Sequence, residues 1–151
     1  MITFGPVQSR RLGKSLGINN IIPPKTCSYS CNYCQVGKTI KKNCKREYFY
    51  KPEFIYERVL KHLKKLNKNN YPDYLTFVSN GEPTLDENLG EAIKLLKETG
   101  IPVAVISNAS LLCFDSVKED LQLADWVSFK IDAGDIITWH LINRPVADLD
   151  F

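Results

Sequence analysis

Residues 27–34 read Cys-Ser-Tyr-Ser-Cys-Asn-Tyr-Cys and hold three cysteines at the spacing C-x3-C-x2-C, with the aromatic Tyr33 directly before the third. Three thiolates in one loop can ligate three irons of a [4Fe–4S] cube, whereas cubes that only carry electrons usually have four cysteine ligands. The fourth iron would then be open to a substrate or a cofactor. The spacing therefore predicts chemistry at a cluster held by Cys27, Cys31 and Cys34.

Two other interpretations of these thiols stay open. A structural zinc ion takes four ligands, commonly in two closely spaced pairs. Cys44 could be the fourth ligand, although it has no partner cysteine at such a spacing. The three thiols could also share a loop by chance, so a second motif is needed to favour one interpretation.

A short apolar run further along the chain ends in a turn. Residues 75–78, Leu-Thr-Phe-Val, predict a buried strand, and Ser-Asn-Gly-Glu-Pro follows them. Gly81 lets the backbone approach a ligand closely, and Glu82 offers a carboxylate to an ammonium group. Pro83 stops the strand because it has no N–H to donate. Such a turn is common by itself, but its position at a strand end after the cysteine loop makes it informative.

The two motifs together resemble the signatures of the radical S-adenosylmethionine (radical SAM) superfamily, a cysteine loop C-x3-C-x-aromatic-C and a Gly-Gly-Glu-Pro turn after the second strand. The resemblance implies two cofactors, a [4Fe–4S] cluster and S-adenosylmethionine, whose reductive cleavage gives a 5′-deoxyadenosyl radical. It implies that the turn binds the amino group of S-adenosylmethionine through Gly81 and Glu82, with Asn80 in place of the first glycine. It also implies that Tyr33 packs on the adenine ring, although Tyr33 could instead fill the interior of the loop.

The opening segment narrows the resemblance. Residues 4–19, Phe-Gly-Pro-Val-Gln-Ser-Arg-Arg-Leu-Gly-Lys-Ser-Leu-Gly-Ile-Asn, and residues 24–27, Pro-Lys-Thr-Cys, are similar to those of a prokaryotic branch of the superfamily described generally as iron–sulfur oxidoreductases. Asp-Ala-Gly-Asp at 132–135 and Ile-Asn-Arg-Pro at 142–145 resemble the same branch. The resemblance covers essentially the whole chain. It implies a reaction class without a substrate, so no catalytic residue is assigned from it.

Strand and helix signals alternate along the chain, which is typical of βα units and a parallel sheet. We expect an α/β fold, namely a partial parallel (βα) barrel of the radical SAM type truncated to about four βα units. Residues 1–151 then form one radical SAM core domain, incomplete at the C-terminus because proteins of this superfamily usually carry six units. The expected strands are Leu16–Ile22, Leu75–Val78, Val103–Ile106 and Trp126–Ile131. Helices are expected to begin near Pro52, Asp86, Ser116 and Asp135, and Ser116 with Glu119 matches a capping box.

The polar candidates all follow expected strands. The cysteines, Glu82, Asn108, Lys130 and Asp132 stand at carboxyl ends, where parallel α/β sheets bind their ligands. Lys130 and Asp132 are two residues apart, so on a regular strand both side chains point to one face. The resemblance implies that this region contacts the ribose or carboxylate of S-adenosylmethionine, and a surface ion pair is the alternative.

Composition narrows the class of protein. The chain of 151 residues is 44% hydrophobic and 25% charged, which is ordinary for a globular domain, and no apolar run approaches the roughly 20 residues of a membrane helix. No signal peptide is visible, so five cysteines predict a cytoplasmic location and thiols that bind metal rather than form disulfides. Cys113 lies in an apolar stretch and is expected to be buried.

Basic residues gather around the cysteine loop, although the net charge is only +3. Those after the loop are Lys38, Lys41, Lys42, Lys45 and Arg46. Those before the loop are Arg10, Arg11 and Lys14. Such a rim could attract an RNA backbone, and a solvated loop is the simpler interpretation.

Three hypotheses of function follow. The first is a radical SAM enzyme that forms a 5′-deoxyadenosyl radical and abstracts hydrogen from a substrate. The second is a non-catalytic protein that binds an iron–sulfur cluster or S-adenosylmethionine. The third is a small zinc module that binds RNA. The expected partners are S-adenosylmethionine, an electron donor and a substrate that could be RNA or a protein, with no membrane involved.

Overall fold

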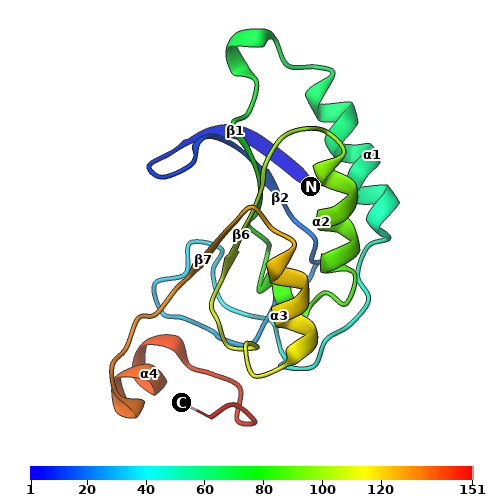
Figure 1. The fold of residues 1–151 in the computed structure, drawn as a ribbon. Helices are drawn as coiled ribbons and strands as arrows, with labels where there is room; N and C mark the ends of the chain where they lie inside the picture. Colours follow the sequence, from blue (N-terminus) through cyan, green and yellow to red (C-terminus); the bar gives the residue numbers. More distant parts are fainter. Residues whose placement is uncertain (151) are drawn as a thin grey trace.

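A five-stranded sheet in the order β1-β2-β5-β6-β7 forms the centre of the computed structural model, which describes residues 1–150 (Figure 1). Strands β2 (Gly13–Ile18), β5 (Tyr74–Phe77), β6 (Val103–Ser107) and β7 (Trp126–Phe129) are parallel. Strand β1 (Thr3–Ser9) pairs antiparallel with β2. The expected α/β fold with a mainly parallel sheet is therefore confirmed.

The edge strand β1 was not expected from the sequence. It contains Gly5 and Pro6, and its pairing with β2 shifts register between Phe4 and Val7. Proline cannot donate to a ladder, so it is tolerated on edge strands and at irregularities of this kind. The sheet consequently has five strands instead of four, and its first parallel strand ends at Ile18, earlier than the expected Ile22.

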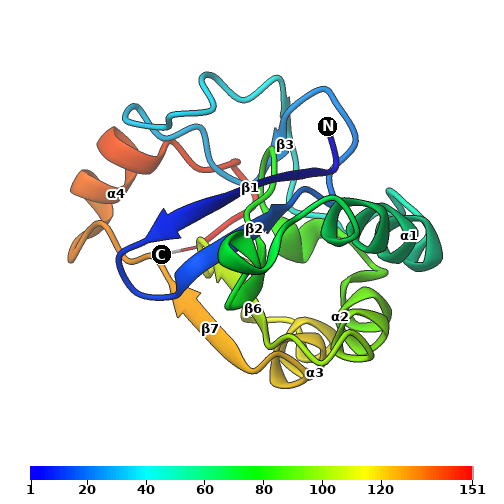
Figure 2. The same ribbon diagram turned by 90° about the horizontal axis from the view of Figure 1, so that it is seen from above.

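Three helices cover one face of the curved sheet, as Figures 1 and 2 show. They are α1 (Pro52–Leu63), α2 (Leu89–Lys97) and α3 (Asp115–Gln122). The shorter elements are the 3-10 helices η1 (Lys68–Asn70) and η2 (Pro83–Leu85) and a two-stranded sheet of β3 (Thr26–Cys27) and β4 (Lys41–Lys42). The apolar side chains Ile55, Val59 and Leu63 of α1 are buried and pack into the main core with Leu75 and Phe77 of β5. Each such side chain contributes about 1.5–3 kcal/mol when fully buried.

One helix start, one helix cap and one burial differ from expectation. Helix α2 begins at Leu89 because residues 83–85 form a 3-10 turn first. Helix α3 follows Phe114 with no side-chain cap, so the capping box expected at Ser116 is wrong. Cys113 is exposed rather than buried. Of the apolar stretch around it, only Leu111 is fully buried in the core.

Helix α4 (Ile136–Asn143) stands apart from the other three and packs near the cysteine loop (Figure 1). Asp135 caps its first turn by accepting a hydrogen bond from the Thr138 N–H at 2.9 Å. The last carbonyls of α4 accept hydrogen bonds from the cysteine loop. The Ser30 N–H donates to the Asn143 carbonyl at 2.9 Å, and the Asn32 N–H donates to the Ile142 carbonyl at 3.0 Å. The end of α4 is therefore fixed to the loop that carries the thiols.

A buried carboxyl group supports the turn after β5. Asp86 is fully buried, and its oxygens accept hydrogen bonds from Asn20 Nδ2 and the Asn88 N–H, both at 3.0 Å. Arg46 donates to the backbone carbonyl of Asp86 at 2.7 Å. Burial is the main cause that raises the pKa of Asp86 from 3.8 to about 6, and the hydrogen bonds partly oppose it.

Asp86 should make the stability of the apoprotein depend on pH. Because its pKa is higher in the folded than in the unfolded chain, the folded form binds this proton more strongly. As the pH rises from about 4 to about 6, the free energy of unfolding should then fall by up to about 3 kcal/mol because of this group. Urea unfolding of Asp86→Asn should show this fall removed, whereas the exposed Asp115→Asn should keep it. An equal fall in Asp86→Asn and the unaltered chain would contradict the assignment.

Candidate functional site

The loops that follow the four parallel strands meet at one edge of the sheet. The cysteine loop follows β2, the turn at 80–83 follows β5, Asn108 follows β6, and Lys130 with Asp132 follows β7. Strand β7 ends at Phe129, so Lys130 and Asp132 stand in the loop beyond it and not on the strand as expected. The two form a loose ion pair, with Lys130 Nζ 3.9 Å from Asp132 Oδ1.

The cysteine loop is held by its own backbone and hydroxyl groups. Cys27 ends β3 and is buried, whereas Cys31 and Cys34 are partly exposed. The Cys34 N–H donates to the Cys31 carbonyl at 3.2 Å. Within the loop, Thr39 Oγ1 donates to the Tyr29 carbonyl at 2.7 Å. These contacts fix the chain on both sides of the three thiols.

Each of the three thiols has a side-chain donor from a different part of the fold. Asn108 Nδ2 lies 3.7 Å from Cys27 Sγ, and Asn143 Nδ2 lies 3.4 Å from Cys31 Sγ. Lys25 Nζ lies 3.0 Å from Cys34 Sγ. Donors to ligating sulfurs are the interactions by which proteins orient and tune metal-bound thiolates.

The thiols differ in acidity. Burial, followed by the charge of Glu82, raises the pKa of Cys27 to about 12. Burial also acts against ionisation of Cys34, but the hydrogen bonds from Lys25 and the Val36 backbone, together with the charges of Lys25 and Lys130, outweigh it and lower the pKa of Cys34. A cation bound at Cys27 would therefore have to displace a tightly held proton, which is the usual consequence of thiolate coordination.

The donor set fits an iron–sulfur cluster better than a single zinc ion. Within residues 1–150, no three His, Cys, Asp or Glu side chains gather closely enough to hold one metal ion. A cluster needs no such gathering, since each of its thiolates binds a different iron. Cys44, the fourth ligand in the zinc interpretation, packs against the main core and also lines a cavity near the loop. Three thiols in one loop can each ligate a separate iron of a cube and leave the fourth iron without a protein ligand.

The turn after β5 contacts the cysteine loop directly. Gly81 forms an isolated parallel bridge with Thr26, and the Glu82 N–H donates to the Thr26 carbonyl at 3.2 Å. Gly81 has φ +145°, and a Cβ at this position would overlap the Thr26 carbonyl. The close approach expected of Gly81 is thus to the protein's own backbone. Asn80 is partly buried, and its N–H donates to Asn19 Oδ1 at 2.8 Å.

The Glu82 carboxylate is turned into the protein. The residue is 2% exposed and accepts hydrogen bonds from Thr84 Oγ1 at 2.7 Å, Ser107 Oγ at 2.7 Å and the Asn108 N–H at 2.8 Å. Burial raises its pKa, against the effect of these donors. The carboxylate thereby ties the turn to the end of β6, where Asn108 donates to Cys27.

A second cluster of side chains joins the cysteine loop to the segment after β7. Tyr33 donates to Asp132, and Asn143 Nδ2 lies 2.8 Å from Asp132 Oδ2. Lys130 Nζ stands 3.7 Å from the centre of the Tyr33 ring. Burial and the hydrogen bond with Asp132 raise the pKa of Tyr33. The predicted residues Tyr33, Lys130 and Asp132 are thus brought together.

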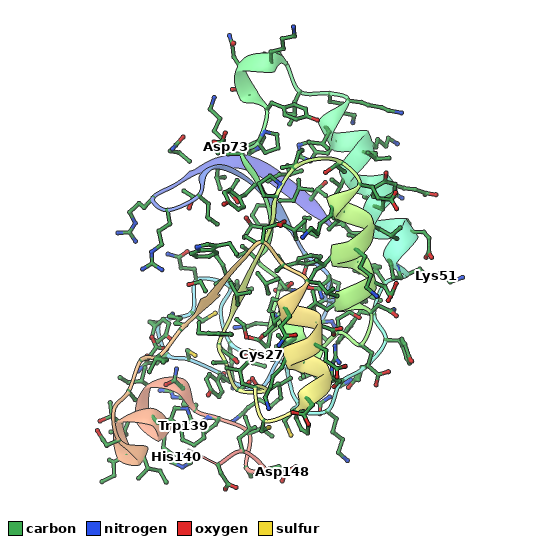
Figure 3. All side chains as sticks on the ribbon, in the orientation of Figure 1. Cys27, Lys51, Asp73, Trp139, His140 and Asp148 are labelled. Carbon is green, nitrogen blue, oxygen red and sulfur yellow. The ribbon has the colours of Figure 1, made fainter. Side chains whose placement is uncertain are left out.

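A cavity of about 430 Å³ opens beside these residues. Of the predicted site residues, Asn108, Lys130 and Asp132 line it. Two of its walls are Tyr29 and Trp139, whose rings meet edge to face with centroids 5.9 Å apart. Figure 3 shows Trp139 and Asp148 at the end of the molecule where α4 lies, with Asp73, just before β5, at the opposite end.

Sequence reasoning missed four residues of this site. Tyr29 and Trp139 carried no periodic signal, and Asn143 stood in a segment noted only for its resemblance. Lys25 is two residues from Cys27 in the sequence, which gave no sign of its burial. The position of each depends on the packing of α4 or on the fold of the cysteine loop.

Comparisons with known proteins identify the family of this chain. The family model described as "Radical SAM superfamily" matches residues 21–149. The chain belongs to the radical SAM superfamily. It is 54% identical over 148 residues to a UPF0026 protein of Methanocaldococcus jannaschii and 38% identical over 148 residues to one of Synechocystis.

The relatives are longer than this chain. The match covers 98% of this chain and 46% of the Methanocaldococcus protein, and 97% of this chain and 54% of the Synechocystis protein. The chain thus spans about half the length of these curated relatives. A solved structure of TYW1 with a lysine-pyruvate adduct bound is 20% identical, with a TM-score of 0.65 over 91% of this chain and 49% of that one. This likeness shows a shared fold.

Replacing Gly81 with alanine should destabilise the apoprotein strongly. The new methyl group meets the Thr26 carbonyl in a backbone conformation that alanine rarely adopts, so we expect a loss of about 3 kcal/mol or more in denaturant unfolding. Gly100→Ala is the matched control, because Gly100 also has a positive φ, +74°, but open space around it. Equal losses in the two variants would show that the contact with Thr26 contributes nothing.

Proposed function

We propose that this chain is the core domain of a radical SAM enzyme that reductively cleaves S-adenosylmethionine at a [4Fe–4S] cluster. The observation that carries the proposal is the arrangement of three thiols, each with its own donor, beside a cavity of about 430 Å³ at the carboxyl edge of a parallel sheet. When bound, the two cofactors would supply a 5′-deoxyadenosyl radical for hydrogen abstraction from a substrate. No substrate is assigned, and the proposed setting is the reducing cytoplasm.

The roles of the protein residues follow from their positions. Cys27, Cys31 and Cys34 would hold three irons, so the fourth iron would have no protein ligand from this loop. Asn108 and Asn143 would orient the first two thiolates through their amide groups. An external one-electron donor completes the reaction, since the described residues offer no redox group besides thiols and aromatic rings.

The turn at 80–83 would present its backbone to the amino group of S-adenosylmethionine. The Glu82 carboxylate already accepts hydrogen bonds from protein donors on both oxygens. Its main contribution in this proposal is therefore to fix the turn, and any contact with the ammonium group would use the remaining lone pairs of these oxygens. Gly81 and Asn80 then offer backbone oxygens beside Thr26 and the cysteine loop.

The cavity residues complete the proposed cofactor site. Lys130 is the cation suited to the carboxylate of S-adenosylmethionine, and its ammonium is only loosely paired with Asp132. Asn108 and Asp132 offer polar atoms to the ribose. Tyr33, with one face under Lys130, remains the residue proposed for the adenine ring.

The RNA-binding zinc module has less support. Several residues of the basic rim are engaged within the protein: Lys41 pairs with Glu47, Arg46 pairs with Asp120, and Lys42 donates to the carbonyls of Arg144 and Pro145. These contacts fold the connector after the cysteine loop onto the domain.

For the part of the chain that the structure describes, no helix is long and apolar enough to span a bilayer.

Cysteine variants test the cluster. Anaerobic reconstitution with iron and sulfide should give a brown, oxygen-sensitive chromophore that is lost when Cys27, Cys31 or Cys34 is replaced by alanine. Cys44→Ala and Cys113→Ala should keep it, because neither thiol belongs to the loop of three. Iron and sulfide analysis with the visible spectrum provides the measurement. Equal loss in Cys44→Ala would identify a four-thiolate site and remove the open iron.

Cleavage of the cofactor tests the reaction. The reconstituted protein with dithionite and S-adenosylmethionine should yield 5′-deoxyadenosine, detected by liquid chromatography and mass spectrometry. Lys130→Met should lower apparent affinity for S-adenosylmethionine about 10- to 100-fold, since charge-assisted hydrogen bonds contribute about 1.5–3 kcal/mol. Lys118→Met, on the exposed face of α3, is the control. A stable cluster that binds S-adenosylmethionine without cleaving it would favour the non-catalytic hypothesis.

A further inference from the structure

Lys25 is a buried cation beside the thiol loop. It precedes β3, and the residue is only 6% exposed. Its Nζ lies 3.0 Å from Cys34 Sγ and 2.5 Å from the Gly37 carbonyl oxygen. Its own carbonyl accepts hydrogen bonds from the N–H groups of Ile40 and Lys41 at 3.2 and 3.0 Å. Both ends of the residue are thus fixed, and the ammonium is held in one place.

This ammonium has no carboxylate partner. None of the ion pairs among residues 1–150 includes Lys25. A buried ammonium group that is not paired with an anion is unfavourable, because it has left water without compensation. The neighbouring groups that can become anionic are the thiols, Cys34 by direct contact and Cys27 by a weaker charge interaction. The ammonium of Lys25 is thus held against the sulfur of Cys34, with the Gly37 carbonyl oxygen as its other acceptor.

We propose that Lys25 is the positioning residue that sets the reduction potential of the cluster by placing a fixed positive charge against the Cys34 thiolate. This inference rests on the function proposed above. Adding an electron to a thiolate-ligated cluster adds negative charge, so a nearby buried cation stabilises the reduced form and raises the potential. Charge and hydrogen bonds at the ligating sulfurs are among the properties by which proteins tune such clusters.

The other donors to the thiols are neutral. Asn108 and Asn143 donate amide N–H groups to Cys27 and Cys31, whereas Lys25 supplies a full charge at low exposure. A lysine that only closed the loop between Cys34 and Gly37 would affect folding or cluster loading but not the potential of a loaded cluster. The reduction potential therefore distinguishes tuning from a purely structural role.

The test compares midpoint potentials of reconstituted proteins, measured by mediated titration with dithionite and followed by visible absorption and electron paramagnetic resonance. Lys25→Met and Lys25→Gln should each lower the midpoint potential by at least about 59 mV. For one electron this shift is a tenfold change in the ratio of reduced to oxidised cluster. Lys42→Met is the matched control, because it removes the same charge from an exposed residue that donates only to the Arg144 and Pro145 carbonyls. It should shift the potential by less than half as much.

Several results would overturn the proposal. These are an unchanged potential in Lys25→Met, equal shifts in Lys25→Met and Lys42→Met, or a potential kept in Lys25→Gln, which would assign the effect to hydrogen bonding alone. Circular dichroism of the apoproteins checks folding, and Lys25→Gln provides the measurement if Lys25→Met does not fold. A folded Lys25→Gln protein without a cluster would make Lys25 an assembly residue instead. If the unaltered protein bound no cluster, the proposed function itself would fail, which is a separate result.

Discussion

The contact between the backbones of Thr26 and Gly81 is the constraint on which the site depends. It brings the chain after β5 against the residue that precedes Cys27. The Glu82 N–H completes the contact by donating to the Thr26 carbonyl. Because a side chain at position 81 would overlap that carbonyl, glycine is required for a reason internal to the protein. The thiol loop is thereby placed at the carboxyl edge of the sheet.

Buried charges are arranged around the loop with opposite signs. Glu82 and Lys25 are both nearly inaccessible to solvent, and they act on the thiols in opposite directions: Glu82 disfavours the Cys27 thiolate, and Lys25 favours that of Cys34. Helix α4 closes the other side through Asn143, which contacts both Cys31 and Asp132. The loop, the turn and α4 thus form one unit. The cavity beside this unit is lined by Tyr29 of the loop, by residues after β6 and β7, and by Trp139 and Asn143 of α4.

The sequence predicted the parts of this arrangement that have local signals. The strands at 75–78 and 103–106 were placed to within about a residue or two, because short apolar runs between turns specify buried strands. The convergence of Asn108 and Lys130 on one edge followed from parallel topology. Strand β1 was missed because Gly5-Pro6 interrupts its pattern. Local patterns also failed at Ser116, where α3 has no side-chain cap, and at Cys113, which is exposed although Leu111 nearby is buried.

The site residues that escaped prediction depend on distant contacts. Lys25 is indistinguishable in sequence from the exposed lysines after the loop, and only the folded loop shows it buried against Cys34. Asn143 approaches Cys31 from 112 positions away in the chain. Motif spacing identifies ligands because they are close in sequence, whereas the groups that orient ligands come from elements brought together by the tertiary fold.

The central claim is a cluster with three thiolate ligands and one open iron. Mössbauer spectroscopy of protein reconstituted with isotopically enriched iron, before and after addition of S-adenosylmethionine, tests it most directly. We expect a [4Fe–4S] spectrum in which S-adenosylmethionine changes the parameters of a single iron and leaves the other three as they were. A cluster whose irons all stay unchanged on addition of S-adenosylmethionine, or a protein that takes up no cluster, would contradict it.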